Sequence, residues 1–85
     1  MKVYIVNKES GAVTDTYTVP LKGFKEEKEA IKYMSLCVEE ILRRSEDFKL
    51  QVIDDKHKII YVEDEYGPNG KRIWYTFYIN TVEVF

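Results

Sequence analysis

The spacing of apolar residues changes along the chain, and each spacing predicts an element of secondary structure. Residues 2–7 contain the run VYIV, which is rich in β-branched residues and apolar on both faces, so an interior strand is predicted. Residues 8–11 supply turn residues, and residues 12–19 alternate apolar side chains with threonines, which indicates a second strand with one solvated face. We expect a hairpin that ends at Pro20, because proline cannot donate a hydrogen bond to a ladder.

The period changes to that of an α-helix from about residue 24 to residue 45. Apolar side chains recur there at spacings of three and four, which lines one face of a helix. They are Ala30, Ile31, Met34, Cys37, Val38, Ile41 and Leu42. Glutamates fill the opening turns and two arginines close the segment, an order that suits the helix dipole.

Alternation returns after this helix. Residues 48–53 predict a third strand, residues 54–57 form a polar turn, and residues 58–66 predict a fourth strand. The segment GPNG, residues 67–70, is a strong turn signal because proline presets φ while asparagine and glycine tolerate positive φ. A long fifth strand is expected over residues 71–85, with a bulge at Asn80 and Thr81.

The predicted order is therefore ββαβββ. This order is typical of an α+β domain in which a single helix packs on a twisted, mainly antiparallel sheet. The length of 85 residues allows one domain, residues 1–85.

Composition narrows the setting of this domain. The single cysteine excludes a disulfide within the chain, which suits a reducing compartment. The apolar runs are far shorter than the roughly 20 residues that span a bilayer, and Asn7 and Lys8 interrupt the start before the core of a signal peptide could form. We expect a cytoplasmic protein with no membrane partner.

The side chains that usually carry catalysis or metal binding are scarce. Cys37 falls on the apolar face of the predicted helix, where a core thiol is expected, and His57 lies in a polar turn between lysines. One cysteine and one histidine give no zinc-binding spacing, and the glycines form no phosphate-binding or nucleophile-elbow motif. We therefore expect no enzyme, no cofactor and no metal.

The segment KRIWYTFYI, residues 71–79, carries more aromatic surface than one helix can cover. A helix of about 20 residues is roughly 10 Å wide, and five strands make a sheet about 24 Å wide, so about half of one face is covered. Simple alternation places Ile73 and Tyr75 on one side of the last strand, and Trp74 and Tyr78 on the other. Both sides are apolar, so a protein-binding face is predicted, with Trp74, Tyr78 and Tyr61 as its anchors.

The acidic run Glu63, Asp64 and Glu65 allows two interpretations. Solvated charges at a strand end explain it adequately, since charge runs are usually solvent-exposed. The functional interpretation is an acidic rim that engages a basic groove of another protein, in imitation of nucleic acid phosphates. We include these three residues among the candidate contacts to a protein partner.

A single-stranded nucleic acid module is the alternative function. Such modules combine stacking aromatic rings with a positive groove, and Lys71, Arg72, Trp74 and Tyr75 offer both in one short segment. Against this hypothesis, 13 cations face 15 anions, so the chain as a whole does not attract phosphate.

The sequence thus favours a small, non-enzymatic protein-binding domain. Its partner is not identified by any motif, and self-association into a homodimer is the simplest form of such binding. In size, acidity and lack of catalytic groups the chain is similar to small accessory proteins of bacteriophages and mobile elements, some of which inhibit enzymes by occupying their surfaces. No individual residue carries this likeness.

Overall fold

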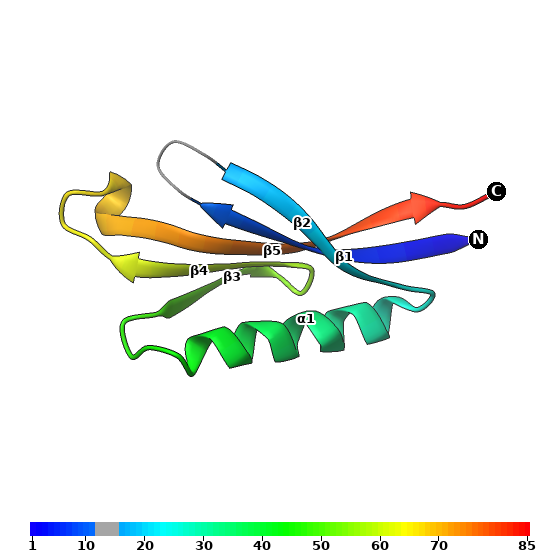
Figure 1. The fold of residues 1–85 in the computed structure, drawn as a ribbon, viewed down its shortest axis with the longest axis horizontal. Coiled ribbons are helices and arrows are strands. Elements are labelled where there is room, and N and C mark those ends of the chain that lie inside the picture. Colours follow the sequence, from blue (N-terminus) through cyan, green and yellow to red (C-terminus); the bar gives the residue numbers. More distant parts are fainter. Residues whose placement is uncertain (12–15) are drawn as a thin grey trace.

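The described part of the chain forms one helix on one five-stranded sheet (Figure 1). The computed structural model of the protein describes the backbone of residues 1–11 and 16–85, and the side chains of residues 1–11 and 18–85. The elements are β1 (Lys2–Gly11), β2 (Thr16–Phe24), α1 (Glu27–Leu42), β3 (Lys49–Asp54), β4 (His57–Glu63), the short 3-10 turn η1 (Pro68–Gly70) and β5 (Lys71–Glu83). The predicted α+β class and the order ββαβββ are confirmed.

The sheet is antiparallel throughout, with the strand order β2-β1-β5-β4-β3. The first and last strands therefore pair at its centre. Because α1 connects the two edge strands β2 and β3, the chain must cross one face of the sheet to pass from one edge to the other. This crossing explains why the helix covers one face and why, among the described residues, only that face acquires a second layer.

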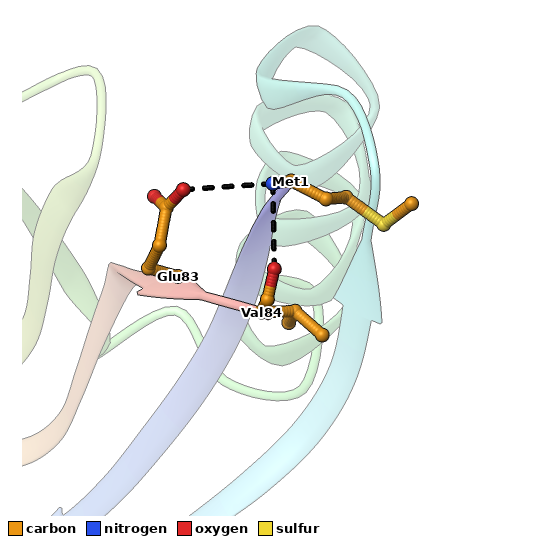
Figure 2. A network of polar contacts seen from close by, with 3 residues as sticks. All are labelled: Met1, Glu83 and Val84. Carbon is orange, nitrogen blue, oxygen red and sulfur yellow. Dashed lines mark hydrogen bonds and ion pairs between the residues drawn. The ribbon is translucent and has the colours of Figure 1, made fainter.

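The two ends of the described chain lie side by side (Figure 2). The ammonium group of Met1 donates to the carbonyl oxygen of Val84 at 3.4 Å and lies 3.5 Å from the carboxylate of Glu83. The amide of Val84 donates in turn to the carbonyl oxygen of Met1 at 2.7 Å. These contacts extend the pairing of β1 with β5 by one residue beyond each strand, to Met1 and Val84.

The hydrophobic core lies between α1 and the sheet. Its fully or nearly buried members are Val6, Ala30, Met34, Val38, Ile41, Ile60 and Phe77. The four helical members belong to the apolar face predicted from the spacing, and Cys37 and Leu42 pack against the same cluster. On the solvent side Glu40 and Arg44 form an ion pair four residues apart, at 3.5 Å.

The first hairpin is longer than predicted. The turn expected at residues 8–11 is wrong, because β1 continues to Gly11, and β2 continues through Pro20 to Phe24. Residues 12–15 of the predicted second strand lie outside the described residues. Pro20 is accommodated because β2 is an edge strand, where a proline need not interrupt a ladder on its outer side.

The turn between β4 and β5 is confirmed. Asn69 has φ 57° and Gly70 has φ 72°, the positive values that the sequence GPNG favours. The bulge predicted at Asn80 and Thr81 is wrong, since both residues keep continuous register with β1. The irregularity of β5 lies instead at Trp74.

Candidate protein-binding site: the open face of the sheet

The face of the sheet away from α1 carries a group of apolar side chains, and we call it the open face. On β4, Ile60 is buried towards the helix, so its neighbours Ile59 and Tyr61 point to the other side. The pairing of β4 with β5 and of β5 with β1 extends this face across the sheet. Its apolar members include Val3, Ile5, Ile59, Tyr61, Ile73 and Tyr78. No described segment of the chain forms a second layer over them.

A β-bulge exchanges the faces of two neighbouring residues in β5. Ile60 pairs with Tyr75 and Tyr61 pairs with Ile73, so Trp74 has no partner on β4. The extra residue moves Ile73 onto the open face, where it is 47% exposed. Trp74 instead lies on the helix side, where its ring meets Phe48 edge-on at a centroid distance of 6.4 Å.

The alternation expected from the sequence is therefore wrong at this point of β5. Unbroken alternation had placed Trp74 with Tyr78, and the bulge separates them onto opposite faces. The one sequence signal for this irregularity is Gly11 on the neighbouring strand. A Cβ atom at Gly11 would lie 3.0 Å from the carbonyl oxygen of Ile73, a closer contact than side chains normally make, so glycine suits the position beside the bulged backbone.

Two aromatic rings anchor the half of the open face formed by β4 and β5. Tyr78 meets the ring of His57 edge-on at 6.5 Å, and the ammonium group of Lys71 lies 4.6 Å from the centre of the Tyr61 ring. Both tyrosines are partly exposed. These contacts fix the orientation of the rings while leaving part of each ring accessible, as a binding anchor requires.

A polar pair lies in the middle of the open face. Asn7 is only 7% exposed, and its side-chain amide donates to the carbonyl oxygen of Ile5 at 3.1 Å and to the side-chain oxygen of Asn80. Its donors are therefore used within the sheet. This pair is a structural feature, since a buried amide needs partners of its own.

The charges of the open face are of both signs. Register places Lys49 and Lys71 on this side, together with Glu9, Asp54 and Glu63. A face on which cations are interspersed with anions does not form the positive groove that follows a phosphate backbone. It is closer to the mixed polar rim of a protein interface.

The three acidic candidates have different surroundings. Asp64 has a structural role, since its carboxylate lies 3.1 Å from the guanidinium of Arg72 and accepts a hydrogen bond from the amide of Tyr66 at 3.0 Å. Glu63 is exposed at the end of β4, and Glu65 is exposed in the turn that follows. A shallow hollow lined by Tyr61, Glu63, Asp64, Glu65, Asn69 and Lys71 brings them beside the open face.

The residues of the nucleic acid hypothesis do not share one face. Lys71 lies on the open face, above Tyr61. Arg72 pairs with Asp64, Trp74 contacts Phe48, and Tyr75 packs against the core beneath α1. A stacking platform needs its rings and cations along one continuous surface, and these four side chains do not provide it.

The groups that could carry chemistry are isolated. No cluster of three or more metal-binding side chains occurs within the described residues. His57 contacts Tyr78, and Cys37 packs against the core from α1. Desolvation, followed by the charge of Cys37 and a hydrogen bond with it, raises the pKa of Tyr33, so this hydroxyl stays protonated at neutral pH.

Comparisons with protein families, with curated proteins and with solved structures give no match to this chain. Within the described residues, α1 is the longest helix, and no helix is long and apolar enough to cross a membrane. The candidate site is therefore defined by the geometry of the sheet and not by similarity to a known protein.

Proposed function

We propose that the chain is a small, non-enzymatic protein-binding domain that contacts its partner through the open face. The observation that supports this function is the absence of a second layer over the apolar side chains of the open face within the described residues. Large apolar patches rimmed by charges are typical of protein-binding sites. A cytoplasmic location and a role as an inhibitor or accessory protein remain part of this proposal.

Tyr61 and Tyr78 are the expected anchors, with Ile59 and Ile73 beside them. Tyrosine combines a large apolar ring with a polar end and is common among the residues that dominate binding energy. Trp74 is not part of this surface, because the bulge places it against Phe48. Glu63 and Glu65 are expected to form the acidic rim.

Affinity capture with matched variants tests this function. Tyr78→Ala removes an anchor from the open face, whereas Tyr66→Ala removes a 91% exposed ring in the turn after β4. Wild type and Tyr66→Ala should recover the same protein from a lysate after nuclease treatment, and Tyr78→Ala should lose it at least tenfold. A tenfold loss corresponds to about 1.4 kcal/mol, within the range of a single anchor.

Two results would count against this function. Equal recovery by all three proteins would show that the open face is not the binding surface. Recovery that disappears with nuclease and falls steeply with salt would favour the nucleic acid alternative, because phosphate contacts release counterions. Circular dichroism spectra of each variant serve as the folding control.

A further inference from the structure

We propose that two copies of the chain associate through β3. The β3 strands of the two copies pair antiparallel and join the two sheets into one. β3 is an edge strand of the sheet, and all six of its residues are exposed. Edge strands present unpaired peptide groups that can pair with another chain. This edge does not include the apolar members of the open face, although Lys49 and Gln51 lie at the margin of that face.

The helix leaves this end of the sheet uncovered. Leu50 and Val52 pair with Ile60 and Lys58, which point towards α1, so both lie on the helix side. The helix lies closest to β1, β5 and β2. As a result Leu50 is 39% exposed and Val52 is 57% exposed, although their side of the sheet contains the core.

The two edges of the sheet differ in how they resist pairing. The edge strand β2 contains Pro20, which has no amide hydrogen, and Leu21 is skipped in its pairing with β1. Both features disrupt a regular edge. β3 contains no proline, and its irregularity is at Ile53, so residues 49–52 remain regular.

A second copy is the occupant that this strand fits. A two-fold axis that is perpendicular to the sheet and passes through Gln51 sets each residue opposite the one that is equally far from Gln51 in the other copy. Leu50 of each copy then lies opposite Val52 of the other. Four apolar side chains then meet between the two helices. The side-chain amide of Gln51 in one copy lies opposite the same amide in the other copy. The two amides can hydrogen-bond to each other, because this group both donates and accepts.

Charge complementarity supports the same arrangement. β3 begins with Lys49 and ends with Asp54, and the pairing with β4 sets both on the open-face side of the sheet. With the axis at Gln51, Lys49 of each copy lies opposite Ile53 of the other, and because Ile53 is the extra residue at the irregularity of β3, Asp54 stands beside Lys49. Opposite charges across a strand pair are favourable, whereas parallel pairing would set like charges together.

The dimer is expected to be reversible. A ladder of about six residues buries less than the roughly 800 Å² per partner of a standard interface, so its population should depend on protein concentration. The two-fold axis also puts both open faces on the same side of the joined sheet. The dimer is then bivalent if each open face binds a partner, and this consequence rests on the proposed function.

Charge reversal tests the dimer with the intact chain. Lys49→Asp and Asp54→Lys each set like charges together in the homodimer, so each variant alone should be a monomer at concentrations where light scattering finds wild type dimeric. Their equimolar mixture should recover the dimer, since every facing pair is then opposite in sign. A mixture that stays monomeric while wild type dimerises would overturn this arrangement, as would a monomeric wild type.

Position-specific cross-linking tests the register. Facing Cα atoms in an antiparallel pair are about 4.5 to 5.5 Å apart, within the range of a disulfide. In a Cys37→Ala background, Gln51→Cys should form a disulfide-linked dimer under mild oxidation, and Thr18→Cys on the other edge strand should not. Equal cross-linking at both positions would overturn the choice of β3.

One further variant separates this inference from the proposed function. Val52→Lys should abolish the dimer, whereas Val19→Lys, at an exposed valine of β2, should leave it unchanged. Both should still capture the partner of the open face. A dimer lost with Tyr78→Lys and kept with Val52→Lys would instead assign self-association to the open face.

Discussion

Phe77 and Tyr78 are neighbours in β5, yet they lie on opposite faces of the sheet and have different surroundings. Phe77 is 0% exposed and is a large side chain of the core, whereas Tyr78 is partly exposed and touches His57. Both are aromatic and both suit a strand. The difference arises because α1 crosses one face only, so the same residue type stabilises the fold on one side and remains available for binding on the other.

Truncating both residues should give the largest difference between the two faces. Phe77→Ala leaves a cavity between α1 and the sheet, so a loss of about 3–5 kcal/mol in the free energy of unfolding is expected. Tyr78→Ala should cost about 1 kcal/mol, because its ring packs only in part. Urea denaturation of both variants measures the difference, and equal losses would mean that the open face is a second core.

The bulge provides the next test, because it reverses the faces of Ile73 and Trp74. Trp74→Ala should cost about 1–3 kcal/mol through loss of the apolar area that the ring buries and of its edge-on contact with Phe48. Ile73→Ala should cost less than about 1 kcal/mol, since its side chain is 47% exposed on the open face. Thermal denaturation of the two variants checks this order, and the opposite order would indicate regular alternation without a bulge.

The smallest expected effect concerns the cation above Tyr61. Lys71→Ala removes a cation–π contact at 4.6 Å, which is expected to cost about 0.5–1 kcal/mol. Lys28→Ala, at an exposed position of α1, is the matched control and should leave the free energy of unfolding unchanged. If the two variants have the same stability, Lys71 does not fix the Tyr61 ring.

Much of the fold could be predicted because its signals are local. The helical spacing from Ala30 to Leu42 requires one apolar face, and the GPNG segment requires positive φ at its last two residues. The ends of the first hairpin could not be predicted, because the residues of KESG suit a turn as well as the end of a strand. Pro20 gave a misleading boundary because an edge strand tolerates it.

The candidate site could be predicted in part. The excess of aromatic surface over what one helix covers follows from dimensions, and Tyr61 and Tyr78 do lie on the open face. The place of Trp74 could not be derived, since a bulge depends on the register of the neighbouring strands and leaves the alternating sequence unchanged. The sequence made Asp64 a candidate contact to a partner, whereas in the structure its carboxylate forms an ion pair with Arg72. This pair could not be predicted, because it depends on how the two side chains approach each other in the folded chain.

The sequence by itself determined the fold class, the order of the helix and the five strands, and the presence of apolar side chains on both sides of β5. Periodicity carries this information, because it reflects which side of each element avoids water. Only the tertiary structure decided which face α1 covers, where β5 bulges, and that β3 is an exposed edge. These features arise from pairing between segments that are distant in the sequence, above all β1 with β5. The stability of such a pair depends on side chains from both strands, so the sequence of one strand alone does not specify it.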